Sequence, residues 1–459
     1  MVILDRNVYN KKTYEYISDT LCQTIPADPT SSIVRKIKNL LKSAPEPLYN
    51  LAKICKPPSH CTAPIIFSQV KTHKEGNPLQ PIISKCNAPT INAERALAKF
   101  ISPHISDHRH TLRSTQHFLE LFQPLMTRID LNLYSADVNS LFPSIPIPHA
   151  SSLLHDVYTT ITPSCAQIES SLTTHILDIN YFSFDHQFFR QSSGAPMGSP
   201  LSSTLAEVVM QNLEATVLPH FLDFFTIFWF RYVDDIFILS NASLQSIQTI
   251  LDRMTSTTPQ ITFSLQPETD GKLAFLDVLI TRENSQFHTQ VYHKPTANTS
   301  IIPSTSMSSR PHKLAAFKSF FTRALTIPSK PEYTHKEVQH IFSIAEQHGF
   351  NKTQISHLWY QAKNKLHTQL IPDHSPTFIG SLSYIPGTSE RISHWLHRKG
   401  YRIATIPGTN IFQSVRSDKP PASLLQDGIY SIPILLPVAP QRLISTQLFG
   451  VSANVFLNI

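Results

Sequence analysis

The first part of the chain alternates between apolar side chains at helical spacing and short apolar runs broken by turn residues. Ser32–Ser43 has apolar positions at helical spacing with basic residues between them, which predicts a helix with one apolar and one basic face. Pro64–Pro81 is punctuated by proline and glycine and indicates a β-hairpin whose arm carries the basic cluster Lys71, His73 and Lys74.

The middle of the chain contains apolar segments that end in turns. Leu131–Leu141 indicates a strand that leads into a proline-rich turn, and a helix is expected to resume near His149. Gly194–Pro200 indicates a tight loop before an amphipathic helix. Ser199 is predicted as the N-cap of that helix and Pro200 as its first residue.

The second half begins with a strong hairpin pattern. Phe228–Leu239 predicts two β-strands joined by a turn at Val233–Asp235. Further strands are expected at Ile261–Leu265 and Phe275–Ile280, and the region 310–400 is expected to be helical. Strands and helices mixed in this way favour an α+β protein.

Composition narrows the class of protein. The chain has 459 residues, of which 41% are hydrophobic and 15% charged, so a folded chain of at least two subdomains is expected. Lys and Arg outnumber Asp and Glu by 39 to 32, a weak tendency towards a polyanionic partner. Met1–Lys12 lacks the apolar core of a signal peptide, and the most apolar stretch, Phe221–Phe230, is too short and too charged to span a bilayer. We therefore expect a nuclear or cytoplasmic protein with no membrane segment.

Two consecutive carboxylates, Asp234 and Asp235, occupy the predicted hairpin turn. An isolated Asp pair in a turn is usually an ordinary polar turn, but here Asp137 ends another apolar segment upstream. Between them in sequence lies a loop with Gly194 and Gly198, which would let the backbone approach a base pair and a nucleotide closely. Nucleotidyl transfer with two Mg²⁺ ions needs hard oxygen ligands of this kind. The three aspartates are therefore candidate ligands of two catalytic Mg²⁺ ions, for which Mn²⁺ could substitute.

Several segments occur in the order of the signature motifs of one family. These segments are Phe67–Lys74, Pro78–Ile82, Tyr134–Ile145, Gly194–Ser202, Arg231–Ile236, Phe275–Val278 and Tyr292–Thr296. Together they resemble the reverse transcriptases of Penelope-like retroelements, which are related to telomerase, and the resemblance extends from Val2 to about Pro433. It implies an RNA-directed DNA polymerase that uses an RNA template, a DNA primer and deoxynucleoside triphosphates. It also implies a right-hand fold of fingers, palm and thumb, in which an antiparallel palm sheet packs on helices.

The same resemblance implies roles for individual residues. Asp137 and Asp234 would bind the catalytic metals, and Asp235 would complete the acidic cluster. Phe142 stands where this polymerase class places the aromatic ring that blocks a ribose 2′-hydroxyl, with packing in the core as the alternative role. Lys71 would contact the incoming triphosphate or the template backbone.

The expected nucleotide-binding set also includes Gly198 and Gln80. Gln80 departs from the family pattern, which has arginine there, and a neutral amide loses both the charge and the bidentate fork for phosphate. A catalytically decayed copy that folds and binds nucleic acid is therefore the alternative function. A viral RNA-directed RNA polymerase is disfavoured, because Phe142 would clash with ribonucleotides.

The resemblance predicts how the chain is divided. Fingers are expected at 1–125, beginning inside the first fingers strand so that upstream residues would be missing, palm at 126–300 and a helical thumb at 301–415. Residues 416–459 are expected to be a remnant of a linker and of the start of a GIY-YIG endonuclease, on the evidence of Asp427–Pro433. Ile434–Ile459 matches no later part of that domain, so no nuclease activity is expected.

Overall fold

The structure described here is a computed structural model of the chain. It describes residues 2–20, 22–42, 53–70, 78–105, 109–163, 166–191, 193–283, 285–295, 301–306, 308–367, 377–385, 387–406, 431–433 and 454–458. The chain divides into two units. One is drawn from Met1–Arg113, Leu131–Pro267 and Pro420–Ile459, and the other from Ser114–Asp130 and Glu268–Lys419.

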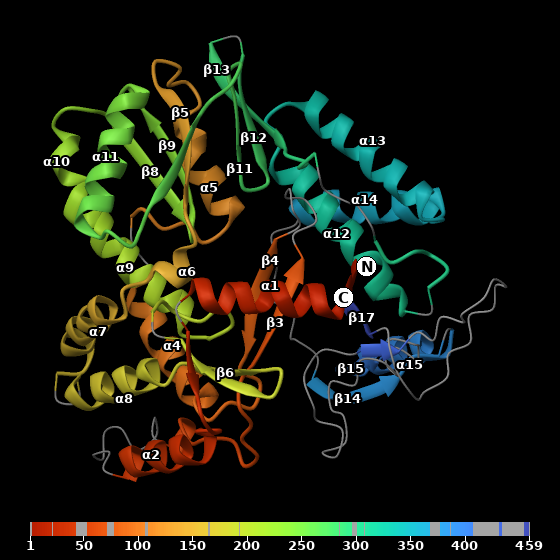
Figure 1. The fold of residues 1–459 in the computed structure, drawn as a ribbon. Helices are drawn as coiled ribbons and strands as arrows, with labels where there is room; N and C mark the ends of the chain where they lie inside the picture. Colours follow the sequence, from red (N-terminus) through yellow and green to blue (C-terminus); the bar gives the residue numbers. More distant parts are fainter. Residues whose placement is uncertain are drawn as a thin grey trace, which may run out of the picture. The chain divides into compact units, whose positions relative to one another are not determined.

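The first unit contains a four-stranded antiparallel sheet in the order β10-β5-β9-β8. Its strands are β5 (Asn132–Val138), β8 (Ile227–Tyr232), β9 (Asp235–Ser240) and β10 (Phe263–Pro267). The apolar run in β9 does not alternate because this central strand is buried on both faces. Helices α9 (Ser202–Val217) and α11 (Leu244–Thr257) pack on the sheet and against each other (Figure 1).

Further helices of the first unit surround this core. They are α4 (Ile91–Ile105), α6 (Leu141–Ser144), α7 (Ile147–Ile161), α8 (Ala166–Asp178) and α10 (Pro219–Leu222). Helix α7 begins directly after Pro146 and has Pro148 in its first turn, where a proline costs no helical hydrogen bond. It buries Ala150, Leu154 and Tyr158, which recur every four residues and so share one face.

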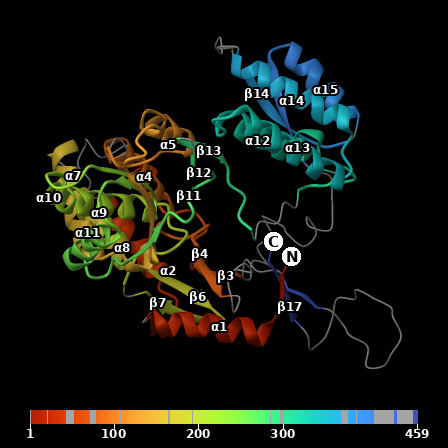
Figure 2. The same cartoon turned by 90° about the horizontal axis from the view of Figure 1, so that it is seen from above.

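A second, five-stranded sheet of the same unit has the order β2-β7-β6-β3-β4. Its strands are β2 (Gln23–Ile25), β3 (Ile65–Val70), β4 (Leu79–Ser84), β6 (Tyr181–Phe184) and β7 (Gln187–Arg190). Helix α1 (Arg6–Asp19) runs along this sheet (Figure 2) and inserts Tyr9 and Ile17 between its side chains. Helix α2 (Thr30–Lys42) buries Ile33 and Ile37 beside Tyr181. A small sheet joins β1 (Val2–Asp5), β17 (Asn454–Asn458) and β16 (Ser431–Pro433) in that order.

The second unit combines a meander and a helical bundle. It contains α5 (Thr115–Phe122), the short 3₁₀ helix Gln123–Leu125, and the sheet of β11 (Lys272–Phe275), β12 (Val278–Glu283) and β13 (Gln286–Val291). Helices α12 (Arg310–Thr326), α13 (Pro331–Gln347) and α14 (Lys352–His367) pack around Phe317, Phe321, Ile341 and Ile355. A parallel pair, β14 (Thr377–Ser383) and β15 (Tyr401–Ile406), is connected by α15 (Thr388–Arg398).

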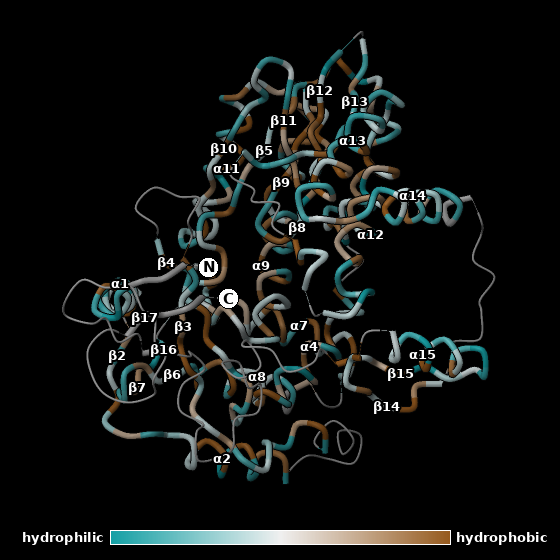
Figure 3. Tube along the Cα trace, turned by 90° about the vertical axis from the view of Figure 1, so that its right-hand side faces the viewer, coloured by the Kyte–Doolittle hydropathy of each residue, from teal (hydrophilic) through white to brown (hydrophobic). Residues whose placement is uncertain are grey.

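Most elements predicted from the apolar pattern are confirmed. The hairpin at 228–239 forms β8 and β9, the segment at 131–141 contains β5, and the helix expected near His149 is α7. The apolar face expected for residues 32–43 is the buried face of α2. The hydropathy colours of Figure 3 distinguish buried from exposed elements, since β9 is hydrophobic whereas much of α14 is hydrophilic. No helix in the described part of the chain has the length and apolar character needed to cross a membrane.

Two predictions of local structure are wrong. The region 310–400 is not helical throughout, because β14 interrupts it at Thr377–Ser383, where serine and glycine lower the preference for a helix. Helix α9 begins at Ser202 with Leu201 at the N-cap, so Ser199 and Pro200 lie in the preceding turn. The Ser199 hydroxyl still accepts a hydrogen bond from the Leu201 amide at 3.2 Å, so it closes this turn and does not cap the helix.

Candidate active site

A cleft of about 630 Å³ opens in the first unit. It is lined by β4 of the five-stranded sheet, by the ends of β5 and β9 in the four-stranded sheet, and by the loop before α9. Six of the residues expected to act on the nucleotide line it: Gln80, Asp137, Phe142, Gly198, Asp234 and Asp235. Lys71 lies outside the described residues. The sequence did not single out Asn139, Ser140, Met197 or Ser203, which also line the cleft.

The aspartates come together because of strand register. Asp137 and Asp235 are directly opposite each other in the antiparallel pair of β5 and β9. Residues opposite each other in this way have their Cβ atoms about 4.5–5.5 Å apart on the same face. Asp234 is in the turn between β8 and β9, and its backbone oxygen accepts a hydrogen bond from the Val138 amide at 2.9 Å. Among the described residues, the carboxylates of Asp137 and Asp234 have no hydrogen-bond or ion-pair partner.

Carboxylates held at the same strand ends repel one another, and a divalent cation would relieve this repulsion. Their oxygens are the hard donors that Mg²⁺ prefers. Within the described residues, no group of three or more His, Cys, Asp or Glu side chains is placed to hold one ion. Mg²⁺ is usually bound by one or two carboxylates and by oxygens of the substrate phosphates, so it does not need a group of three protein ligands. The carboxylates at these strand ends fit that kind of coordination.

The turn that carries Asp234 has a strained backbone. Val233 adopts a φ of 57°, in the left-handed region that β-branched residues rarely enter. This conformation suits the primed turns of two-residue hairpins, whose twist matches that of the flanking strands. The surrounding structure must therefore hold Val233 in this conformation.

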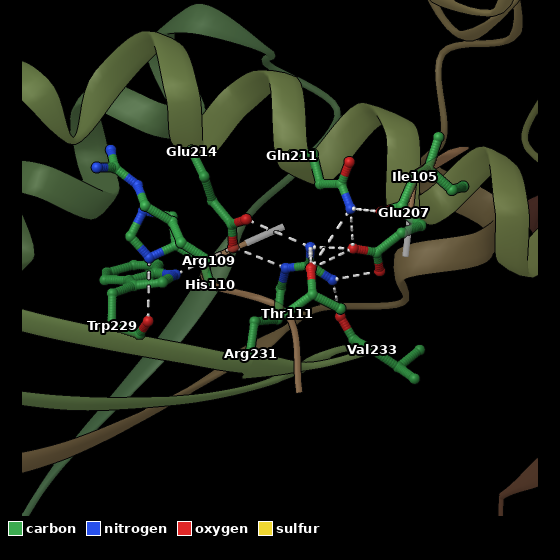
Figure 4. Close-up of polar contacts among 10 residues, drawn as sticks. All are labelled: Ile105, Arg109, His110, Thr111, Glu207, Gln211, Glu214, Trp229, Arg231 and Val233. Atoms are coloured by element: carbon green, nitrogen blue, oxygen red, sulfur yellow. Dashed lines mark hydrogen bonds and ion pairs between the residues drawn. The ribbon is translucent and has the colours of Figure 1, made fainter. Parts of the chain in front are cut away.

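A buried ion network lies beside this turn (Figure 4). The Arg231 side chain is fully buried, and its Nε donates to Glu214 Oε1 at 2.7 Å. Its two terminal nitrogens donate to the two carboxylate oxygens of Glu207, each at 2.9 Å. Burial raises the pKa of Glu207, but the hydrogen bonds and charge of Arg231 outweigh this and hold the pKa below its usual value. Glu207 and Glu214 both come from α9, so the network ties that helix to β8.

The loop before α9 is held equally closely. The Ile83 amide of β4 donates to the Met197 oxygen at 2.7 Å. Ser199 Oγ donates to Glu94 Oε2 at 2.5 Å, and the other oxygen of Glu94 accepts from the buried Lys85 Nζ at 2.7 Å. Burial raises the pKa of Glu94, but the Lys85 charge and the hydrogen bonds from Lys85, Ser199 and Thr90 together outweigh burial, so the pKa is lowered overall. This buried pair was not predicted from the sequence, where its signal is a charged residue, Glu94, among the apolar positions of α4.

Glycines in this loop allow close approach between protein segments. A Cβ at Gly194 would lie 2.3 Å from the Pro143 oxygen, and a Cβ at Gly198 would lie 2.4 Å from the Ile83 oxygen. Both residues have positive φ, at 71° and 109°. Close packing on the protein backbone therefore already requires glycine at both positions, whereas the expected approach to a nucleotide remains a prediction.

Gly194→Ala is expected to destabilise the first unit by about 2–4 kcal/mol, because the methyl group collides with backbone and left-handed φ is unfavourable for alanine. Urea unfolding of the wild-type protein and of Gly194→Ala measures this difference in the free energy of unfolding. Gly400→Ala is the control, since Gly400 has φ of 79° but open space around its Cβ position. It should cost only about 1 kcal/mol in the second unit. Equal costs for the two variants would mean that the contact with Pro143 is not limiting.

Phe142 lies in a position that is compatible with either of the roles predicted for it. It is partly buried against the main core, and it also lines the cleft. The Ala195 amide donates to its backbone oxygen at 2.8 Å, so the main chain at Phe142 is fixed independently of its ring. The ring therefore borders the cleft, and the main chain that carries it is held in place.

An antiparallel sheet with carboxylates at its strand ends, a second sheet and a helical bundle are the parts of the right-hand polymerase fold. Residues 74–269 match the family described as reverse transcriptase (RNA-dependent DNA polymerase). This part of the chain is therefore similar to a reverse transcriptase domain. No curated protein matches the chain.

One solved telomerase structure shares the fold of this chain, and further solved structures are similar to it at lower scores. Telomerase from Candida albicans, in complex with a fragment of telomeric RNA, matches with a TM-score of 0.51 and 10% identity, over 78% of this chain and 62% of its own. This chain thus spans less than two thirds of that telomerase. Telomerase from Candida tropicalis matches with a TM-score of 0.46 and 10% identity, over 85% of this chain and 68% of its own. The RNA-dependent RNA polymerase of a sicinivirus matches with a TM-score of 0.44 and 14% identity, over 76% and 74%.

Proposed function

We propose that this protein is an RNA-directed DNA polymerase of a Penelope-like retroelement, which extends a DNA primer on an RNA template with deoxynucleoside triphosphates. The observation that carries the proposal is the cleft, in which Asp137, Asp234 and Asp235 lie with Phe142 and Gln80 inside a reverse transcriptase domain. The retroelement origin rests on the motif resemblance. For the division of the chain we retain fingers at 1–125, palm at 126–300, thumb at 301–415 and a C-terminal remnant at 416–459.

In the reaction, the primer 3′-hydroxyl oxygen bonds to the α-phosphorus of the nucleotide, the bond to pyrophosphate breaks, and the hydroxyl proton passes to solvent water. Asp137, Asp234 and Asp235 would hold the two Mg²⁺ ions, which would supply activation of the hydroxyl and stabilisation of the leaving pyrophosphate. Gln80 in β4 and Gly198 in the neighbouring loop border the space for the nucleotide. Lys71, which precedes β4 in sequence, is proposed to contact the triphosphate or template backbone.

The test of this function is primer extension by the full chain on an RNA template with Mg²⁺, and in parallel with Mn²⁺. Incorporation that depends on RNA template and on deoxynucleotides supports the proposal. The second candidate function, binding without catalysis, is favoured by the neutral Gln80. It would be supported by tight binding of the primer–template duplex with no extension under either metal.

Gln80→Arg distinguishes a weakened enzyme from a decayed one. Gln80 and Ile82 are two residues apart in β4, and both line the cleft, so the side chain at position 80 faces the proposed triphosphate site. Charge-assisted hydrogen bonds to phosphate contribute roughly 1.5–3 kcal/mol, against about 1 kcal/mol for a neutral amide. The apparent Michaelis constant for nucleotide should therefore fall about three- to thirtyfold, with little change in template affinity.

Steady-state primer extension at several nucleotide concentrations measures this constant. Gln187→Arg is the control, because Gln187 is an exposed residue of β7 in the same sheet and does not line the cleft. An unchanged constant for Gln80→Arg in an active enzyme would show that position 80 lies away from the substrate.

A further inference from the structure

The two peptide groups on either side of Asp234 are each held by a hydrogen bond. The Asp234 carbonyl accepts from the Val138 amide of β5 at 2.9 Å. The preceding carbonyl, that of Val233, accepts from a terminal nitrogen of Arg231 at 3.2 Å. When both peptide planes are fixed, so is the direction in which the Asp234 side chain leaves the backbone. One of the two restraints is a main-chain contact of the sheet, and the other depends on a single side chain.

Arg231 is itself held from several directions. The guanidinium has five N–H donors in a rigid plane, and Glu207, Glu214 and the Val233 carbonyl together use all of them. Further donors satisfy the two carboxylates. Thr111 Oγ1 and Gln211 Nε2 donate to Glu207 Oε1 at 2.5 and 2.7 Å, and Trp229 Nε1 donates to Glu214 Oε1 at 3.0 Å (Figure 4).

The backbone of Arg231 is also held, by two hydrogen bonds to the segment 110–112. Its amide donates to the His110 oxygen, and its own oxygen accepts from the Leu112 amide, both at 2.7 Å. The segment at 110–112 therefore pairs with β8 at the same residue whose side chain reaches the turn. Arg231 cannot shift without breaking contacts to α9, to this segment and to Val233 at once. That rigidity is what a residue needs in order to hold a strained turn in one conformation.

We infer that Arg231 is a positioning residue, which holds the Val233–Asp234 turn so that the Asp234 carboxylate is presented at the cleft. This inference rests on the proposed function for its consequence in catalysis. Lysine cannot replace arginine here, because one compact ammonium group cannot reach both glutamates and the Val233 carbonyl in fixed directions. The network could stabilise the whole unit, or it could hold only the turn. Hydrogen exchange distinguishes these effects, because it reports on the turn and on the rest of the unit separately.

The experiment compares Arg231→Lys with the wild-type chain by hydrogen exchange of the peptide that covers residues 230–236. Exchange of the turn amides should accelerate about tenfold or more, while a peptide from α11 in the same unit keeps its protection. Arg282→Lys is the matched control, since Arg282 forms a 2.7 Å ion pair with Glu268 in the other unit. Glu207→Gln is the second variant, should Arg231→Lys fail to fold, and a smaller acceleration at the same peptide is expected.

A second measurement is Mn²⁺ binding, followed by electron paramagnetic resonance on the protein alone. The Asp234-dependent part of the binding should weaken about tenfold in Arg231→Lys. In an active enzyme kcat should fall about 10–100-fold, with little change in the Michaelis constant for nucleotide.

The outcomes separate the two claims. Wild-type exchange at 230–236 in both variants would overturn the positioning role, whatever the activity. Accelerated exchange in a protein whose Mn²⁺ binding does not depend on Asp234 would support the positioning role and contradict the proposed metal site.

Discussion

Asp234→Asn is expected to reduce nucleotide incorporation by at least about 10³-fold, while affinity for the primer–template duplex stays within about threefold. The reduction corresponds to about 4 kcal/mol of lost transition-state stabilisation, the size expected when a group that balances developing charge is removed. The fold should survive, because the contact of Asp234 with β5 uses its backbone oxygen and asparagine is well tolerated in turns. Single-turnover extension and a filter-binding or anisotropy titration measure the two quantities.

The control for this variant is Asp223→Asn, which removes an exposed carboxylate of the same unit that does not line the cleft. It should leave both incorporation and binding unchanged. Equal losses of binding and synthesis in Asp234→Asn would mean that Asp234 supports the nucleic acid or the fold, and would contradict its assignment as a metal ligand.

Phe142→Val is expected to raise the ratio of ribonucleotide to deoxynucleotide incorporation by about 10–200-fold, the range in which a steric pocket discriminates between small differences in substrate. The ring lines the cleft while the Phe142 backbone is held by Ala195, so a smaller side chain opens space without moving the main chain. Competition between a ribonucleotide and its deoxy counterpart in primer extension measures the ratio. Loss of the partly buried ring should also lower the free energy of unfolding by about 1–3 kcal/mol.

Phe100→Val separates selectivity from packing. Phe100 is another partly buried ring against the same core, and it does not line the cleft. It should reduce stability to a similar extent and leave nucleotide selectivity unchanged. If Phe142→Val rejects ribonucleotides as strongly as the wild-type protein does, the ring at Phe142 only fills the core.

Local pattern was sufficient for the elements that carry the aspartates. The hairpin at 228–239 could be predicted because two apolar runs bound a short polar turn, and both strands bury their side chains whatever lies beyond them. The helices α2 and α7 could also be predicted from local pattern, because their apolar residues recur at helical spacing and so share one face. The strand β14 was missed because its serine and glycine give it little apolar alternation, and its pairing with β15 is a contact distant in sequence.

The buried ions could not be assigned from pattern alone. Glu207 and Glu214 lie two turns apart on one face of α9, among apolar residues, and that placement is a signal that charged partners must be found elsewhere. The sequence does not say which cation meets them. The partner is Arg231 in a strand otherwise rich in aromatic residues, and only the packing of α9 on β8 brings the three side chains together.

By itself, then, the sequence determined the chemistry that is available and the local elements that carry it, because residue type and apolar period act over short distances. It placed Asp234 in a hairpin turn, Asp235 next to it and Asp137 close to the end of a strand. Only the tertiary structure decided that Asp137 faces Asp235, because the register of β5 against β9 depends on pairing between distant segments. Only the tertiary structure, too, decided that the glycines of the 194–198 loop serve close packing on Pro143 and Ile83, because the space around a Cβ is set by neighbours that the local sequence does not contain.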